Sequence, residues 1–264
     1  MSIFREPELR FATYLGADRI LVSDHASNLV LEADREGNLT HSTIDGKFTK
    51  PEGIAVSAAG EVFVVNRHPG SVHVFGRDAE GGFVPLRAFG EGILNQPVGI
   101  TLDNARGLAY VADNENHRVA VFSFAGCLER TIGNGYGQEP GRMFCPCGVA
   151  IHKGLVIVAE WGSGRVQVFN AQGVSLLAID GFPHAHDVVA NADGEVFVAL
   201  YSHKRVRRFR ISVHADGTTS FTIPEGVEQL EHSPTGILEE GGRVAYVSKT
   251  RVVQVAPITT GPGR

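Results

Sequence analysis

Short apolar runs separated by polar turns follow one another along the chain in a repeating order. One unit contains the runs 54–56, 62–65 and 72–75, with Gly, Asn and other turn residues between them. Similar triplets begin near residues 97, 146, 186 and 234, and a degenerate copy begins near residue 10. Runs rich in Val, Ile and Phe and bounded by turn residues are typical of β-strands. The pattern therefore predicts one strand-rich unit repeated along the chain.

Most units add a fourth run, for example residues 174–178. Four strands per unit, a period of about 44 residues and no amphipathic helical stretch are the signature of a propeller blade. We therefore predict an all-β fold, a six-bladed β-propeller of four-stranded antiparallel blades, with residues 1–264 forming one domain. Because a propeller ring must close, either residues 2–4 or residues 256–259 supply the last outer strand, and the pattern does not choose between them.

Charge and hydropathy disfavour a protein that binds nucleic acid, binds a membrane or is secreted. Lys and Arg total 24 against 29 Asp and Glu, and the net charge of −5 gives no overall attraction to nucleic acid or to an acidic membrane surface. No run approaches the roughly 18 apolar residues of a membrane span, and the first residues lack the basic-then-apolar order of a signal peptide. We expect a cytoplasmic protein without a membrane partner.

Three cysteines fit a reducing compartment, because an odd number cannot all pair within one chain. We interpret Cys127 and Cys145 as small buried apolar residues. Cys147 is the exception, because it lies directly before a predicted innermost strand, where a thiol either packs or ligates a metal.

Several motifs resemble the NHL-repeat family. The segments 133–137 and 140–144, followed by Pro146-x-Gly148-Val149-Ala150 and Arg165-Val166-Gln167-Val168-Phe169, look like that repeat at full length. The spacing from Asp113 to Arg118 also matches, and its simplest interpretation is an ion pair within one blade. The resemblance covers roughly residues 10–255. It implies the propeller fold and leaves function open, because this fold serves enzymes and interaction scaffolds.

One blade is similar to those of two enzyme groups with this fold. The segment Pro183-His184-Ala185-His186-Asp187 resembles the zinc-binding context of the peptidyl-hydroxyglycine amidating lyases. The gluconolactonases are similar in placing calcium or zinc ligands at nearby inner-strand positions. The resemblance implies a divalent metal, zinc or calcium, on the propeller axis.

Aligning the repeats gives one residue per blade at this axial position. They are Arg10, Glu52, Val98, Cys147, His186 and Thr235. Glu, Cys and His all ligate zinc, so Glu52, Cys147 and His186 are the candidate metal ligands. The lyase pattern would place three histidines here, whereas only His186 matches and Arg10 would oppose a cation.

The loops between the second and third strands open on the same face. We assign catalytic roles to Arg67, His68 and Tyr201, with Arg10 or Arg67 holding an anionic group and His68 or Tyr201 acting as acid or base. We assign ligand contacts to Arg10, Glu160, Trp161 and His203, because groups that titrate near neutrality beside aromatic rings suit a small-molecule pocket.

Two functional hypotheses follow. The first is a metal-dependent lyase or hydrolase that acts on a small molecule at the axial mouth, without a nucleotide or organic cofactor because no phosphate-binding loop is present. The second is an interaction scaffold that binds a peptide or protein on its loop face. The basic run 203–210 is interpreted as a solvated strand face, which makes nucleic acid a disfavoured partner.

Overall fold

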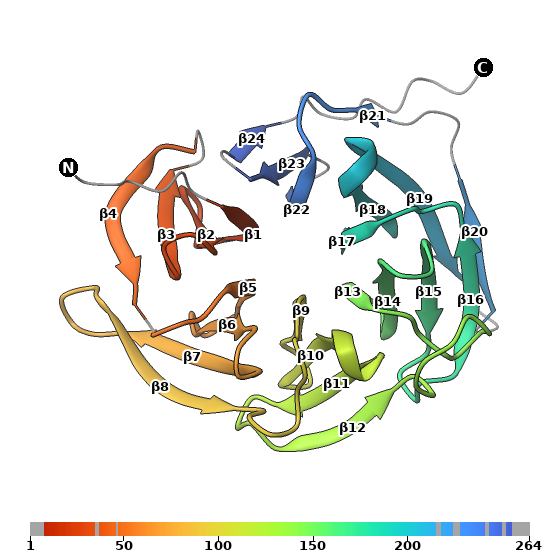
Figure 1. The fold of residues 1–264 in the computed structure, drawn as a ribbon, viewed down its shortest axis with the longest axis horizontal. Helices are drawn as coiled ribbons and strands as arrows, with labels where there is room; N and C mark the ends of the chain where they lie inside the picture. The colour runs from red at the N-terminus through yellow and green to blue at the C-terminus, as the bar shows by residue number, and fades with distance from the viewer. Residues whose placement is uncertain are drawn as a thin grey trace.

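Antiparallel sheets surround a central axis in the computed structural model, which describes residues 8–34, 37–45, 47–214, 218–223, 228–240, 243–249 and 252–254 (Figure 1). Each sheet is built from consecutive strands, so the all-β propeller of four-stranded antiparallel blades is confirmed. Five sheets are complete blades with four or more strands, and the last sheet has three strands within the described residues. Residues 2–4 and 256–259, the two candidates for its outer strand, lie outside the described part of the chain.

The innermost strands line the axis, and neighbouring ones contact each other around the ring. They are β1 (Leu9–Tyr14), β5 (Pro51–Val56), β9 (Ile100–Asp103), β13 (Pro146–His152), β17 (Ala185–Ala190) and β22 (Pro234–Glu240). The hydroxyl of Thr235 in β22 donates to the Leu9 carbonyl of β1 at 3.1 Å. The last sheet therefore joins the first one at the axis.

The second strands are the most buried, because each lies within its own sheet and packs between two neighbouring sheets. They are β2 (Arg19–Asp24), β6 (Val62–Asn66), β10 (Leu108–Asp113), β14 (Leu155–Glu160), β18 (Glu195–Leu200) and β23 (Arg243–Ser248). All residues of β6 and β14 are buried. Burial on both faces explains why these segments are continuous apolar runs rather than alternating ones.

The third and outer strands complete the sheets. The third strands are β3 (Leu29–Asp34), β7 (Ser71–Arg77), β11 (Arg118–Ser123), β15 (Arg165–Phe169), β19 (Arg205–Val213) and β24 (Val252–Gln254). The outer ones are β4 (Leu39–Ile44), β8 (Phe83–Phe89), β12 (Leu128–Ile132), β16 (Ser175–Asp180), β20 (Thr219–Thr222) and the short β21 (Glu228–Gln229), which pairs with β19. Separate apolar clusters fill the gaps between neighbouring sheets, for example Phe63 and Phe122 in one cluster. No helix within the described ranges is long and apolar enough to cross a membrane.

The contact between the sheet β17–β21 and the sheet β22–β24 differs from the other contacts between sheets at Asp187. Aligned positions of the other repeats include Gly53, Gly99, Gly148 and Gly236, whereas Asp187 places a buried carboxylate there. Its Oδ2 accepts a hydrogen bond from the Ile237 N–H of β22 at 2.9 Å, and its Oδ1 accepts one from the Val188 N–H at 2.8 Å. The carboxylate therefore ties β17 to β22. Burial raises the pKa of Asp187 to about 7, although both backbone donors favour the ionised form.

The raised pKa predicts that Asp187 makes stability depend on pH. The folded protein binds the Asp187 proton more tightly than the unfolded chain does, so this group costs stability as the pH rises from about 4 to about 7. In thermal unfolding, the melting temperature of Asp187→Asn relative to the parent should rise across that range and level off above it. Asp193→Asn, in an exposed turn, is the control and should show no such trend. A parent-to-variant difference that is constant from pH 4 to 8 would contradict the prediction.

Candidate functional site

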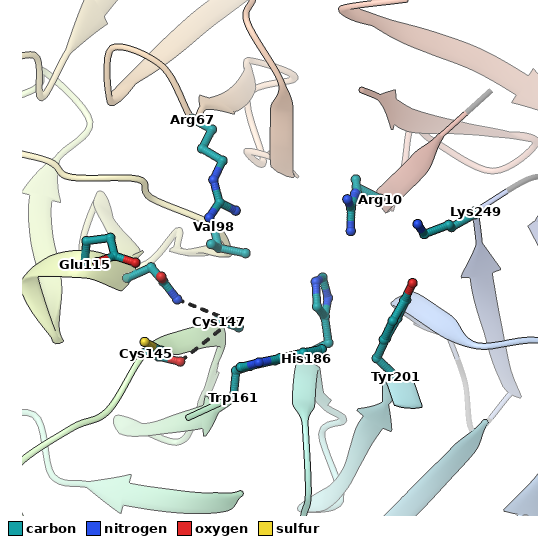
Figure 2. A pocket seen from close by; sticks show the side chains of 11 residues that line it. Arg10, Arg67, Val98, Glu115, Cys145, Cys147, Trp161, His186, Tyr201 and Lys249 are labelled. Atoms are coloured by element: carbon teal, nitrogen blue, oxygen red, sulfur yellow. Dashed lines mark hydrogen bonds between the residues drawn. The ribbon is translucent and has the colours of Figure 1, made fainter. Parts of the chain in front are cut away.

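A cavity of about 400 Å³ lies at one end of the axis (Figure 2). Residues at or beside the innermost strands and residues in the turns after the second strands line it. They are Arg10, Arg67, Val98, Asn114, Glu115, Cys145, Cys147, Trp161, His186, Tyr201 and Lys249. The predicted meeting of axial positions and second-to-third-strand loops on one face is therefore what the structure shows.

Buried carboxylates at the ends of the second strands hold these turns in place. Asp113 ends β10, and its Oδ2 accepts from Arg118 Nε at 2.7 Å, which confirms the predicted ion pair within one blade. Its Oδ1 accepts from the Asn95 N–H at 2.7 Å. The turn that follows is the short 3-10 segment η1 (Asn114–Asn116), which ends at His117 in a left-handed conformation. The turn thus delivers Asn114 and Glu115 to the cavity.

Glu160 performs the same structural task at the end of β14, and this corrects its assignment as a ligand contact. Its side chain is fully buried. Oε1 accepts from Arg165 Nε and Gln167 Nε2, and Oε2 accepts from the Phe144 N–H and the Ser163 hydroxyl. A carboxylate with four donors inside the protein has no position left for a ligand, so Glu160 supports the turn that carries Trp161.

His186 enters the cavity in a defined protonation state. Its Nδ1 lies 2.7 Å from the Thr235 carbonyl oxygen of β22. A carbonyl oxygen only accepts hydrogen bonds, so Nδ1 carries the proton and Nε2 keeps its lone pair in the neutral ring. Burial lowers the pKa of His186 to about 4; Glu52 opposes that effect and Arg10 adds to it. His186 is therefore a neutral acceptor at physiological pH.

Glu52 lies behind the cavity wall in a buried polar network. Its Oε1 accepts from Arg67 Nη1 at 2.9 Å and lies 3.2 Å from His25 Nε2. Burial raises the pKa of Glu52, but the contact with His25 and the nearby positive charge of Arg10 outweigh it and hold the pKa below its usual value. His25 Nδ1 in turn accepts from Arg10 Nε at 3.3 Å. Glu52 thus stays ionised and orients the cations of the wall.

The two arginines of the cavity differ in how fully they are bound. Arg67 uses all three side-chain nitrogens, with Nη1 on Glu52 and both Nε and Nη2 on the side-chain oxygen of Gln96. Arg10 donates through Nε to His25 and through Nη2 to Glu8, and Nη1 has no partner in the part of the chain that the structure describes. Arg10 therefore keeps hydrogen-bonding capacity for a ligand.

The structure does not group the three predicted metal ligands, Glu52, Cys147 and His186, and metal binding stays a prediction. The described residues contain no group of three His, Cys, Asp or Glu side chains placed to hold a metal. The Oε1 of Glu52 is occupied by Arg67, and burial strongly raises the pKa of the Cys147 thiol, which therefore stays protonated. Cys147 Sγ accepts from Asn114 Nδ2 and donates toward the Cys145 carbonyl. Two arginines and a lysine in the same cavity also oppose a divalent cation.

Aromatic side chains form one wall of the cavity. Trp161 stacks on His184 with ring centroids 4.8 Å apart and contacts the rings of His186 and Tyr201 at 5.8 Å each. Tyr201 belongs to the second 3-10 turn, η2 (Tyr201–His203), which follows β18. Figure 2 shows the His186 ring and the Tyr201 hydroxyl pointing toward the same space as the head groups of Arg10 and Lys249.

Comparisons with known proteins agree with this architecture. A model described as the NHL repeat matches residues 94–122. Similar solved structures include a streptogramin B lyase (13% identity, 95% of this chain and 94% of that chain, TM-score 0.59). A catalytically inactive virginiamycin B lyase from Staphylococcus aureus with quinupristin is also similar (12% identity, 97% of both chains, TM-score 0.62). So is the nidogen/laminin complex (17% identity, 87% of this chain and 84% of that chain, TM-score 0.64). A comparison with curated proteins found no match.

The chain is a β-propeller. At these identities the solved structures share the fold alone with it, and they do not transfer an activity to its cavity.

Two predicted catalytic or ligand residues lie outside the propeller's cavity. His68 and His203 are exposed, and neither is among the cavity-lining residues. Both follow the second strand of their sheet by two or more positions, so their side chains lie beyond the first turn residue, which is the one that reaches the axis.

The basic run 203–210 lies mostly along strand β19, and Arg208 and Arg210 pair with Glu195. Two cysteine interpretations also change, because Cys127 is exposed and Cys145 is only half-buried.

Lys249 is a cavity residue that the sequence analysis did not identify. It directly follows β23, just as Arg67, Asn114, Trp161 and Tyr201 directly follow the second strands of their own sheets. Aligning that one position through all repeats would have identified it. Its ammonium lies 3.6 Å from the Glu8 carboxylate, which also binds Arg10.

Proposed function

We propose that this propeller is a lyase that acts on a small organic anion in the axial cavity, with His186 as the base. The observation that carries the proposal is the hydrogen bond from His186 Nδ1 to Thr235, which leaves Nε2 as a lone-pair donor among cationic and hydroxyl groups. A cavity of about 400 Å³ is of the size that small-molecule sites have. The similar folds of a streptogramin B lyase and a virginiamycin B lyase support the choice of a lyase. In this proposal the three-stranded sheet β22–β24 is the sixth blade of the ring.

The reaction that these groups support is an elimination. The Nε2 lone pair of His186 takes a proton from a carbon next to the acid group, the C–H electron pair becomes the new double bond, and the leaving group departs with its own bonding pair. Tyr201 lines the cavity, and in this proposal its hydroxyl gives that group a proton. Arg10 and Lys249 stabilise the negative charge that builds up on the substrate.

Anion binding also adjusts the base. Arg10 lowers the pKa of His186, so an anion that neutralises this cation raises the basicity of Nε2 in the complex. Free protein thus keeps the base deprotonated, whereas bound substrate makes it a stronger proton acceptor. The proposed reaction uses no metal. The separate prediction of a bound divalent metal is tested by metal analysis of protein purified without chelator.

Removing the base should slow turnover strongly. We expect His186→Gln to lower kcat/KM by roughly a hundredfold or more, because a positioned general base contributes about 10²–10⁴. The measurement is proton NMR in D₂O with carboxylic acids that carry a β-leaving group, in which new vinyl signals report elimination. On the acid side, kcat/KM of the parent protein should fall as the pH approaches about 4, the pKa of His186.

The matched control is His203→Gln, which changes an exposed histidine outside the cavity. It should react like the parent. Equal turnover by the His186→Gln variant and the parent would overturn the assignment of the base. Tight binding of acids without any elimination would instead favour a binding protein.

A further inference from the structure

The axial cavity has two chemically different sides. Val98, Cys147 and Trp161 belong to one apolar cluster on the axis, and all three line the cavity. Arg10 and Lys249 occupy another side (Figure 2). A ligand that fills both sides must combine an apolar group with a group that cations attract.

Local charge balance selects the anion-binding side. Arg10 and Lys249 share one carboxylate, that of Glu8, so two cations face one anion. Arg67 is paired with Glu52, and Glu115 also lines the cavity, so one cation there faces two anions. Direct ion pairing therefore leaves more uncompensated positive charge at Arg10 and Lys249 than at Arg67, which favours an anionic ligand there. The donors that it meets are the Nη1 of Arg10, which has no partner among the described residues, and the half-exposed ammonium of Lys249.

Trp161 of the apolar side is also part of an aromatic wall, and this wall is suited to contact a planar ring. Trp161, Tyr201 and His186 contact one another with ring centroids 5.8–6.0 Å apart, and all three line the cavity. Aromatic walls favour planar groups, which they contact by offset stacking or edge-to-face. His186 is part of this wall, and its ring points toward the space that Arg10 and Lys249 also face (Figure 2). Its Nε2 can therefore accept a hydrogen bond or a proton from the atoms that link the two parts of the ligand.

We propose that the ligand of the axial cavity is a carboxylic acid bearing an aromatic ring, with its carboxylate on Arg10 and Lys249 and its ring against Trp161. This inference names the substrate class of the proposed lyase and rests on the same cavity. It makes Arg10, and not Arg67, the residue that determines specificity for an acid.

Intrinsic fluorescence gives a direct readout, because Trp161 is the only tryptophan of the protein. The probes are 3-phenylpropanoate, its uncharged amide 3-phenylpropanamide, and propanoate, which lacks the ring. We expect saturable quenching or a spectral shift with 3-phenylpropanoate. The amide and propanoate should each bind at least about tenfold more weakly, because each loses one of the two interactions.

Three variants assign the carboxylate to its partner. Arg10→Gln should weaken 3-phenylpropanoate binding about tenfold or more and remove the preference over the amide. Arg67→Gln should retain that preference. Arg106→Gln, in an exposed turn paired with Asp103, is the charge-matched control and should bind like the parent. Circular dichroism and thermal unfolding establish that each variant is folded before binding is measured.

The inference is overturned if the amide binds as well as the acid, if propanoate binds as well as 3-phenylpropanoate, or if 3-phenylpropanoate does not bind the parent. A larger loss for Arg67→Gln than for Arg10→Gln also overturns it. These outcomes are separate from those of the proposed function. Binding of aromatic acids with no elimination upholds the ligand class and refutes the lyase, whereas elimination confined to non-aromatic acids does the opposite.

Discussion

Replacing Glu160 by alanine should cost about 3–5 kcal/mol in the free energy of unfolding, which is the range for breaking a buried ion pair by removing one partner. The Glu160 side chain is fully buried, and its partner Arg165 is nearly so. The substitution leaves the Arg165 guanidinium as an uncompensated buried charge. It also removes the acceptor of the Phe144 N–H and the Ser163 hydroxyl. Urea unfolding followed by circular dichroism measures the loss.

A half-exposed ion pair provides the matched control. Glu61 and Arg87 pair at 2.7 Å, with about a quarter of each side chain exposed (25% and 26%). Glu61→Ala should cost no more than about 1 kcal/mol, because solvent screens such pairs. If Glu160→Ala were no more destabilising than Glu61→Ala, the buried Glu160 carboxylate would not stabilise the fold more than a half-exposed ion pair does.

The second large effect is expected for Gly148→Ala, at the close contact of two innermost strands. A Cβ at this position would lie 2.7 Å from both the Asp187 Cα and the Val188 nitrogen of β17. Those are backbone atoms of a neighbouring blade, so the strain is relieved only by moving β13 and β17 apart. We expect a loss of about 3 kcal/mol, at the upper end of the usual cost of overpacking. Ligand binding should weaken as well, because Cys147 and His186 adjoin the displaced segments.

Gly76→Ala is the control for this prediction. A Cβ there would meet only the end of the Leu86 side chain, at 3.2 Å, and the side chain can move aside. Its effect on the free energy of unfolding should be close to zero. If the two alanine variants unfolded at the same urea concentration, close backbone approach at Gly148 would not limit the packing of the ring.

Much of the architecture was predictable because blade formation depends on local patterns. The apolar runs at 62–65 and 72–75 became β6 and β7, and the repeat spacing placed Arg10, Val98, Cys147 and His186 at one end of the axis. The pairing of Asp113 with Arg118 was predictable for the same reason, because both residues belong to one turn.

The site predictions that need correction concern side chains whose surroundings come from more than one segment. Glu160 was assigned a ligand contact, whereas in the structure it occupies the same repeat position as Asp113 and accepts four hydrogen bonds within the protein. Glu52 was predicted to bind a metal, yet Arg67 occupies its Oε1, and His25 lies 3.2 Å from the same oxygen. Cys147 stays protonated because neighbouring blades bury it.

By itself the sequence determined the strands, their grouping into blades, and the end of the axis where unusual residues gather, because period and turn chemistry act within about 44 residues. The tertiary structure alone decided what those residues can do. The proton of His186 is fixed by the carbonyl of Thr235, 49 positions away, and Lys249 shares the Glu8 carboxylate with Arg10 where the ring closes. Contacts between blades determine the protonation of His186 and the balance of charges around the axial cavity. The repeat pattern within one blade does not encode these contacts.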